Sequence, residues 1–429
     1  MLDSFISALS ALRANGTAVD AVGNNLANLS TVGFKKSVVN FRDVVGDVLS
    51  GSGSTQVGSG VAQPFTPKQF TQGSIQTTGG DLDAAIQGEG FFILRQITGT
   101  GNSPSASARL YTRAGDFKVD ESGHLISQSG ERVQGWSLNT AENAVNTSDP
   151  IGDIVVPVGT SRAARATTNI SVDLNLDAST AAGTGFAVPV EIFDSLGNSH
   201  TLTVTYTKTD NPGEWSVNFS LPPSDGTVTF TSTTINFDAN GQLTTVPDGP
   251  PPGSIGGINI DFSNPAVNDI ADLTYSLWNS VPSGEDPGSA RITQFSQPST
   301  PISSSQDGAA AAQLTGVSID DGGSVKAVYS NGERVEVAKI ALASIRNPDS
   351  LVSTGNNNYT VGSGTATPTV GEAARGGRGA IVSKSLEASN VDIAEEFTKL
   401  IQFQRAYQAN ARVITTTDEI SQDTINLKR

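Results

Sequence analysis

Between Leu2 and Leu26 the chain repeats apolar or small residues at alternating spacings of three and four positions. The series runs Leu2, Phe5, Leu9, Leu12, Gly16, Val19, Gly23, Leu26. In an α-helix this spacing puts every member on one stripe, which is typical of helices that pack along a shared seam. A second face carries Ala8, Ala11, Ala14, Ala18 and Ala21. A helix that is apolar or small on two faces needs more than one neighbour to cover them.

The carboxyl-terminal end has the same spacing, at Ile393, Phe397, Leu400, Gln404, Tyr407, Ala411 and Ile414. Ser389 and Asp392 precede this series in an N-capping pattern, so a second helix is predicted to begin near residue 393. The two helices could pair only with each other. The second apolar face of the first helix instead favours contacts with other copies of the chain. The periodicity alone leaves both arrangements open.

The interior, from about residue 80 to 380, is rich in Thr, Val, Gly and Asn, which predicts short strands joined by tight turns. Asp or Asn followed closely by Gly separates apolar runs at Asp120–Gly123, Asp238–Gly241 and Asn331–Gly332. An Asn-Gly pair favours a hairpin turn in which both residues have positive φ. We therefore predict a mainly β fold, mostly antiparallel, with α-helical termini.

Two stretches are predicted to interrupt this pattern. Residues 50–60 (SGSGSTQVGSG) are mostly Gly or Ser, which predicts a flexible joint after the first helix. Residues 247–257 (PDGPPPGSIGG) are mostly Pro or Gly and are predicted to form neither helix nor central strand.

The composition excludes several classes of function. The 429 residues include 42 acidic and 26 basic side chains, a net charge of −16, which argues against nucleic-acid binding. Cysteine is absent, and the two histidines, His124 and His200, follow turns and are predicted to be exposed, so no metal site or cofactor is expected. No apolar run is long enough for membrane insertion. No secretory signal is recognisable at Met1, so the chain is expected to stay inside or to leave by another route.

Several segments, in order along the chain, resemble the signature motifs of the bacterial flagellar rod and hook axial protein family. They are Asn24–Asn28 (NNLAN), Thr31–Lys35 (TVGFK), Gly73–Phe92 (GSIQTTGGDLDAAIQGEGFF), Tyr111–Phe117 (YTRAGDF), Ser389–Asp392 (SNVD) and Gln404–Asn410 (QRAYQAN). Together they span nearly the whole chain. The outer segment around Val188–Thr207 resembles the hook members of the family more than the shorter rod members.

The resemblance implies a structural, non-enzymatic subunit of the flagellar hook. Such a subunit self-assembles into a hollow flexible tube that passes motor torque to the filament and admits later subunits. The implied parts are a terminal helical assembly domain (1–33 and 385–429), a flexible connector (34–75), a middle β domain (76–155 and 305–384) and an outer β domain inserted in it (156–304). The implied partners are other copies of the chain, the distal rod, hook cap and hook–filament junction proteins, and the flagellar type III export apparatus, through which it would leave the cell.

The contact between copies is predicted to use the two helical seams together with three asparagines. Amides of Asn24, Asn25 and Asn28 can bridge neighbouring helices in a tightly packed wall. The alternative is a helix that frays toward Gly33, a residue suited to following a helix end. The predicted interface residues are Leu2, Phe5, Leu9, Leu12, Val19, Leu26, Asn24, Asn25, Asn28, Ile393, Phe397, Leu400, Gln404, Tyr407, Ala411 and Ile414.

Two other functions compete with the hook interpretation. A distal rod-type axial protein would share the terminal helices, and the outer segment 156–304 is the discriminator. A secreted β-rich adhesin or carbohydrate-binding protein would use the Thr- and Asn-rich interior with Trp136, Trp215 and Trp278 as exposed platforms. An enzyme has the least support, because we find no nucleophile, phosphate-binding or dinucleotide motif.

Overall fold

The computed structural model describes residues 2–45, 58–96, 109–139, 144–244, 254–278 and 289–426. The chain forms two compact units. The first comprises Met1–Val158, Gly316–Val328 and Arg334–Arg429, and the second comprises Gly159–Thr315 and Tyr329–Glu333. The finer division into four parts remains a proposal.

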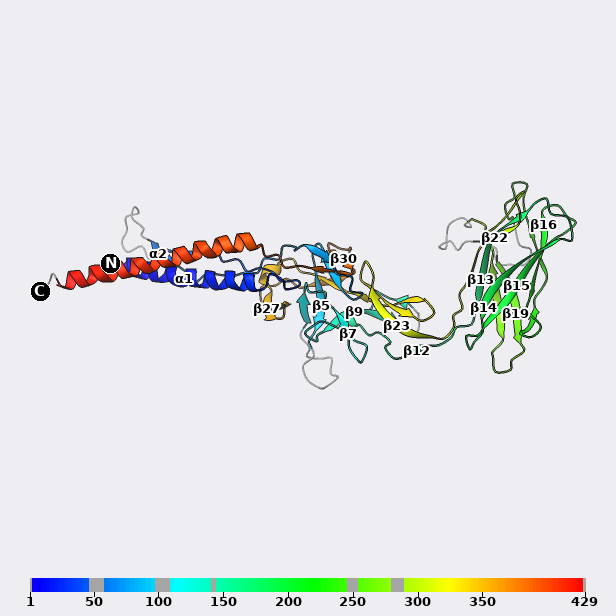
Figure 1. Ribbon diagram of the computed structural model, residues 1–429, viewed down its shortest axis with the longest axis horizontal. Helices are drawn as coiled ribbons and strands as arrows, with labels where there is room; N and C mark the ends of the chain where they lie inside the picture. The colour runs from blue at the N-terminus through cyan, green and yellow to red at the C-terminus, as the bar shows by residue number, and fades with distance from the viewer. Residues whose placement is uncertain are drawn as a thin grey trace. The chain divides into compact units, whose positions relative to one another are not determined.

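The structure has a helix at each end of the chain, as predicted, and both helices belong to the first unit. Helix α1 (Leu2–Ala27) and helix α2 (Ile393–Asn426) lie side by side, with the two chain ends at the same end of the pair (Figure 1). Helix α2 begins one residue after Asp392, whose Oδ1 accepts a hydrogen bond from Glu395 N at 2.8 Å. The N-cap is therefore Asp392 and not Ser389, because only Asp392 reaches the third backbone N–H of the helix.

Helix α1 ends well before Gly33, so Gly33 does not follow the helix end as the fraying alternative supposed. Gly33 instead marks a close approach between two parts of the chain. Its φ is 66°, and a Cβ there would lie 2.6 Å from the backbone nitrogen of Ala114. Any side chain at this position would force the two backbones apart.

The segment after α1 folds back on itself. Strands β1 (Asp43–Val45) and β2 (Gly58–Val61) are antiparallel, and single bridges join Ser37 to Lys68 and Asn40 to Phe65. Strand β2 lies on α1, where Val61 N donates to Ser10 Oγ at 3.0 Å. Most of the Gly/Ser stretch lies outside the described residues, but its flanks are paired. The flexible joint expected at this place therefore stays a prediction.

The β structure of the first unit surrounds a core that includes Phe91, Ile93, Tyr111, Trp136 and Tyr359. Two short pairs carry the chain toward the helices: β3 (Ile75–Thr77) with β31 (Ser385–Glu387), and β4 (Ala84–Gln87) with β30 (Ala380–Ser383). A larger antiparallel sheet runs through β24 (Ser324–Tyr329), β25 (Arg334–Ile340), β9 (Arg132–Asn139), β5 (Phe91–Arg95), β6 (Arg109–Thr112), β28 (Asn358–Thr360) and β27 (Val352–Gly355).

Shorter strands extend the same sheet around β9 and β5. They are β7 (Lys118–Val119), β8 (Leu125–Ile126), β10 (Ala144–Val145), β11 (Gly152–Asp153), β26 (Leu342–Ser344) and β29 (Thr369–Gly371). A 3₁₀ turn, η1 (Pro348–Ser350), precedes β27. Strand β23 (Ala312–Ile319) crosses from the second unit into the first, and its start pairs with β12 (Ser161–Arg162).

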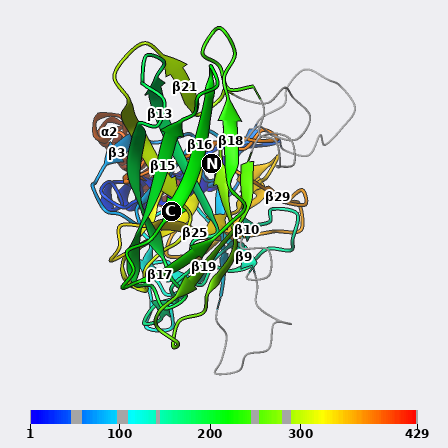
Figure 2. The same cartoon turned by 90° about the vertical axis from the view of Figure 1, so that its right-hand side faces the viewer.

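The second unit is a sandwich of two sheets around one apolar core. One sheet has the order β14 (Gly185–Phe193), β15 (Ser199–Lys208), β16 (Glu214–Ser220), β18 (Thr233–Asn236), of which Figure 2 shows β15, β16 and β18 in front. The other has β17 (Gly226–Thr229), β19 (Ser254–Phe262), β20 (Ile270–Ser276), β13 (Asn169–Asp177) and β21 (Ile292–Phe295), with β22 (Thr300–Gln306) on β13. Alternate residues of β15, Leu202, Val204 and Tyr206, are fully buried, as their spacing predicts.

The strands are mostly antiparallel, as predicted, although β13 pairs in parallel with β20 and β21. One expectation is corrected. Of the Pro/Gly stretch 247–257, the part up to residue 253 lies outside the described residues, but Ser254–Gly257 begin β19. Gly257 has a φ of 71° where the pairing of β19 with β20 shifts register, so glycine here permits a bulge and does not end the strand.

The three predicted turns form hairpins of a different kind from the one expected. Gly123, Gly241 and Gly332 have positive φ, whereas Asn240 and Asn331 do not. In the second of these turns Asp238 Oδ1 accepts from Asn240 N and Gln242 N. In the first two turns an aspartate side chain thus fixes the start of the turn. In all three turns glycine alone supplies the left-handed residue, which is a type I turn followed by a bulge.

Candidate assembly interface

Helix α1 has one face closed against its own chain. Ala8, Ala14, Ala18, Val22 and Asn25 are buried, and they follow the alanine stripe, not the leucine seam. Alanine lets two helices approach closely, because it adds little volume between their axes. One of the two faces of α1 is therefore covered by α2 and the connector within a single chain.

The leucine seam of α1 is only partly covered. Phe5 is 37% exposed, and Leu9, Leu12, Val19 and Leu26 are half-buried, whereas the side chain of Leu2 lies outside the described ones. The two seam glycines, Gly16 and Gly23, are not sites of close contact within the chain. A Cβ at Gly23 would meet nothing within 4 Å, and one at Gly16 would be 4.0 Å from the Tyr407 ring.

The predicted seam of α2 is more open still. Ile393 (49%), Phe397 (51%) and Tyr407 (40%) are exposed, as is Gln404, while Leu400, Ala411 and Ile414 are half-buried. The more covered face of α2 instead follows Glu396, Leu400, Phe403, Asn410 and Ile414. It shares Leu400 and Ile414 with the predicted seam but leaves Ile393, Phe397 and Gln404 outside it. The structure thus does not bring the two predicted seams together as one continuous contact.

Of the three asparagines, only Asn25 bridges separate segments. Its side chain is fully buried, Nδ2 donates to Ser37 O and to Glu396 Oε2 at 2.9 Å each, and Oδ1 accepts from Ser37 N at 2.9 Å. Asn25 therefore joins α1, the connector and α2 of one chain. Asn28 Nδ2 donates to Asn24 O within the last turn of α1, and Asn24 is exposed.

A buried ionic cluster lies where the helices meet the β structure, and we call it the root cluster: Lys35, Arg113 and Glu387. Lys35 Nζ is 2.6 Å from Glu387 Oε1, and Arg113 Nη1 is 3.3 Å from Glu387 Oε2. Lys35 also donates to Thr71 O at 2.7 Å, and Gly73 N donates to Glu387 Oε1 at 2.9 Å. The cluster thus joins the start of the connector, strand β31 and the segment after β6.

Burial dominates the electrostatics of the root cluster. It lowers the pKa of Lys35 despite the attraction of Glu387, and it lowers the pKa of Arg113 in the same way. Two cations share one carboxylate with almost no access to water. Loss of that carboxylate would leave two uncompensated charges, so Glu387 is the residue on which the cluster depends.

Outside the root cluster a more exposed network holds the first turns of α2. Glu395 accepts from Lys36 Nζ at 2.8 Å and lies 2.7 Å from Lys399 Nζ. Hydrogen bonds from these two lysines lower the pKa of Glu395 to about 2. Asn390 adds a third tie, because its Oδ1 accepts from Lys36 N at 2.7 Å and its Nδ2 donates to Gln69 O at 2.8 Å.

Sequence reasoning missed the root cluster, although all its members lie in or beside the resembling motifs. Lys35 ends one motif, Arg113 lies in another, and Glu387 precedes Ser389–Asp392. Glycines of the same motifs fit this junction: a Cβ at Gly73 would lie 2.0 Å from Ala388 O, and one at Gly115 would lie 1.7 Å from Ala84 O. The motifs are distant in sequence and converge on one junction, which spacing alone could not indicate.

Other candidate groups do not form a site of chemistry. Within the described ranges no three His, Cys, Asp or Glu side chains are placed to hold a metal ion, and no helix is both long and apolar enough to cross a membrane. The expected exposure of the histidines is wrong. Both histidines are half-buried. His200 Nε2 is 3.2 Å from Asp194 Oδ2, and the centroid of its ring is 4.6 Å from the centroid of the Phe262 ring.

Models of known protein families match most of the chain. Residues 6–35 match the flagella basal body rod protein model, and residues 85–175 match the flagellar hook protein FlgE/F/G D1 domain. Residues 177–309 match the flagellar basal body protein FlaE D2 domain, and residues 382–427 match the flagellar basal body rod FlgEFG protein C-terminal model. The terminal helices and the β structure between them thus match separate models, and these models follow one another along the chain.

Known proteins resemble the chain over its full length. The flagellar hook protein FlgE of Borreliella burgdorferi is 35% identical, with 100% of both chains covered, and that of Escherichia coli is 31% identical, with 99% and 100% covered. The crystal structure of Helicobacter pylori flagellar hook protein FlgE2 has a TM-score of 0.51 over 73% of this chain at 16% identity, which supports the fold alone. The full-length identity and the family models, together with the paired terminal helices, show that the chain belongs to the flagellar hook protein FlgE family.

Proposed function

We propose that copies of this hook-family chain assemble through the outward faces of α1 and α2 into a hollow, flexible tube that passes torque from the flagellar motor to the filament. One observation carries the proposal. Large apolar side chains remain exposed along α2, namely Ile393, Phe397, Ile401, Tyr407, Val413 and Ile420. Apolar side chains exposed in rows along one element are characteristic of protein interfaces.

Exposure on two flanks of α2 supports an open assembly. Ile393 and Phe397 lie on one side of the helix, and Val413 and Ile420 lie on the other, as their positions at 100° per residue require. A subunit with different apolar surfaces on two flanks can contact two neighbours by unlike patches. Such heterologous contacts generate rings or helical filaments, which a tube requires.

Membership of the family supports a set of partners and a location. We infer that the chain forms part of the flagellum, joins the distal rod at one end and the hook–filament junction proteins at the other, and grows beneath a hook cap. We also infer that it leaves the cell through the flagellar type III export apparatus. Its role is structural, and we assign no catalytic residue.

The competing functions have less support. A rod-type protein is disfavoured because the D2 model matches residues 177–309 and the hook relatives align with the whole chain. The adhesin interpretation loses the observation on which it depended. Trp136 and Trp215 are buried and Trp278 is half-buried, so they do not offer a row of open aromatic platforms for a sugar.

Electron microscopy of the purified full-length chain tests the proposal, with hollow curved tubes as the expected result. The double variant Phe397→Ser, Ile401→Ser should remain folded but form no tubes, because both side chains are about half exposed in the single chain. The matched control is Val352→Ser, which removes an equally exposed apolar side chain from β27. Persistent tubes in the double variant, or a wild-type chain that stays solitary at high concentration, would overturn the proposal.

A further inference from the structure

The helical pair is tied to the β structure by two chain crossings. The root cluster and Asn390 fix both of them, because Lys35 and Lys36 follow α1 while Glu387 and Asn390 precede α2. Between the end of α1 and this tie, residues 28–32 make mostly local bonds: Thr31 Oγ1 donates to Asn28 Oδ1, and Thr31 N donates to Asn28 O. Among the described residues one hydrogen bond ties this segment to another element, from Asn357 Nδ2 to Val32 O at 2.9 Å.

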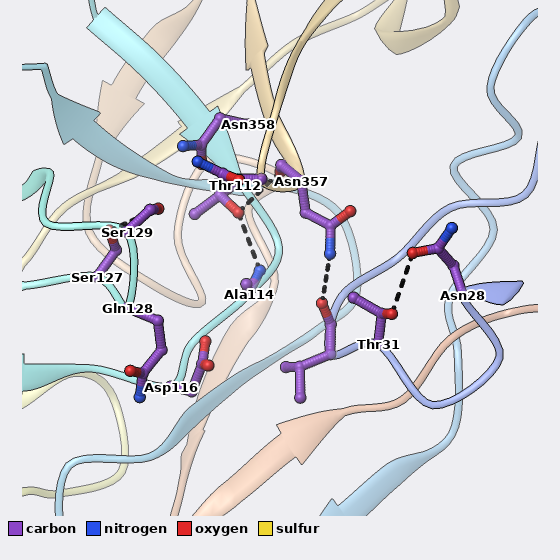
Figure 3. Close-up of a pocket in the computed structure, with 12 residues that line it drawn as sticks. Asn28, Thr31, Thr112, Ala114, Asp116, Ser127, Gln128, Ser129, Asn357 and Asn358 are labelled. Carbon is purple, nitrogen blue, oxygen red and sulfur yellow. Dashed lines mark hydrogen bonds between the residues drawn. The ribbon is translucent and has the colours of Figure 1, made fainter.

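That bond spans a polar cleft of about 730 Å³. One wall is the α1 exit with Asn28, Thr31 and Val32, and the opposite wall carries the ends of β6 and β8 and the tip of the β27–β28 hairpin. Figure 3 shows the Asn357 side chain pointing toward the segment that carries Thr31, and a dashed line marks its bond to Val32 O. The exit segment therefore has space beside it that no described side chain fills.

Asn357 occupies a backbone position that usually favours glycine. Asn356 and Asn357 have φ values of 51° and 57° and form the two-residue loop between β27 and β28. In such a loop glycine is preferred at the second position, because a Cβ is strained at positive φ. Glycine would relieve the turn but would carry no amide to reach Val32.

The tip that carries Asn357 is itself firmly placed. Thr112 Oγ1 donates to Asn357 O at 3.0 Å and accepts from Ala114 N at 3.1 Å. Asn358 Nδ2 donates to Glu131 Oε1 at 3.1 Å, and Asn358 pairs with Thr112 in the sheet. The donor is thus held on the sheet, while the acceptor belongs to a segment with room to move.

We propose that Asn357 is a positioning residue that latches the α1 exit to the β structure, and that the cleft lets this exit swing when the latch opens. The inference rests on the proposed function, because a tube that bends as it turns needs a small, repeatable change between its inner helices and its β structure. A neutral hydrogen bond beside water-accessible space suits this, since water replaces the lost partner when it opens. The compliance of the subunit is then located at residues 28–32.

The test compares Asn357→Gly with Asn356→Gly in the full-length chain. Each variant replaces an asparagine that has a positive φ in the same turn, and so relieves its backbone strain. Only Asn357→Gly removes the side-chain amide that donates to Val32 O. We expect hydrogen exchange at the backbone amides of Leu29, Thr31 and Phe34 to accelerate about five-fold in Asn357→Gly and to stay unchanged in Asn356→Gly. Equal exchange in the two variants would overturn the latch.

A second variant and a second measurement keep the test decisive. Asn357→Asp tolerates the same backbone conformation but places a carboxylate against the Val32 carbonyl, so it should accelerate exchange at least as much. Tubes of Asn357→Gly should show a shorter persistence length by electron microscopy than tubes of Asn356→Gly. Exchange is measured on the chain before assembly, so a chain that forms no tubes but shows the exchange difference contradicts the proposed function alone. If Asn357→Gly forms tubes with the wild-type persistence length and shows wild-type hydrogen exchange, the latch is contradicted but the proposed function is not.

Discussion

The outer sandwich and the terminal helices solve the same problem of apolar burial in different ways. In the sandwich two sheets close on one core, and residues such as Trp215, Tyr206 and Leu273 are fully buried within one chain. In the helices one face of α1 is closed, but the seam of α2 leaves side chains such as Phe397 about half exposed. The difference indicates that the sandwich buries its large apolar side chains within one chain, whereas the helices leave apolar surface uncovered.

The largest expected effect separates the two regions directly. Trp215→Ala should lower the free energy of unfolding of the second unit by about 3–5 kcal/mol, because a fully buried indole leaves a cavity. Phe397→Ala should change the stability of the unassembled chain by less than about 0.5 kcal/mol. Calorimetry of both variants measures the contrast, and a Phe397→Ala penalty as large as that of Trp215→Ala would contradict it.

The root cluster, where the helices meet the β structure of the first unit, should be nearly as sensitive as the sandwich core. Glu387→Gln removes the carboxylate that Lys35 and Arg113 share, so stability of the first unit should fall by about 3–5 kcal/mol. Glu395→Gln is the matched control, since its side chain is 46% exposed and its ion pairs are worth less than about 1 kcal/mol. Urea unfolding compares the two, and similar losses would mean that burial does not set the importance of the root cluster.

Replacing a glycine on the open face of α1 by alanine should increase stability, in contrast to the substitutions above. A Cβ at Gly23 meets nothing within 4 Å, so Gly23→Ala should stabilise the unassembled helix by about 1 kcal/mol. If a neighbouring copy approaches this face closely, the same variant should assemble less well. Circular dichroism and light scattering follow the two effects, with Gly16→Ala, next to Tyr407, for comparison. Improved stability together with unimpaired assembly would place the contact between copies elsewhere.

The smallest effect concerns pH. Hydrogen bonds from Lys36 and Lys399 lower the pKa of Glu395 to about 2 from its ordinary value of 4.5. A depressed folded-state pKa contributes stability that is present above about pH 4.5 and is lost as the pH falls toward 2. The first turns of α2 should therefore loosen in that window, modestly because Glu395 is partly exposed and salt screens it. Glu395→Gln should flatten the profile of helix content against pH, and an unchanged profile would contradict the assignment.

Periodicity predicted the elements well and their partners poorly. The helices, the alternating burial of Leu202 and Tyr206 and the hairpins all follow from local spacing. Local spacing could not indicate that α1 turns its alanine stripe toward its own chain, because that choice depends on α2 and the connector. It also assigned positive φ to Asn240 and Asn331, since an Asn-Gly pair suits both a two-residue type I′ loop and a longer loop in which a type I turn precedes a bulge.

The candidate site shows the same division between local and distant information. The exposed seam residues of α2 follow from sequence alone, although their role in contacts between copies remains a proposal. The partners of Asn25 could not be predicted, because Ser37 and Glu396 lie 12 and 371 positions away. The root cluster likewise joins residues 352 positions apart, which only the pairing of β3 with β31 brings together.

The paired strands beside α1 have a practical consequence for this chain. Val45 and Gly58 face each other across the β1–β2 ladder, so whatever polypeptide lies between them enters and leaves at one point. Extra sequence inserted there adds length without displacing either strand, because the ends stay anchored. An epitope tag or a cysteine for dye labelling placed in this interval would therefore report on living flagella while sparing the route from the helices to the sheets.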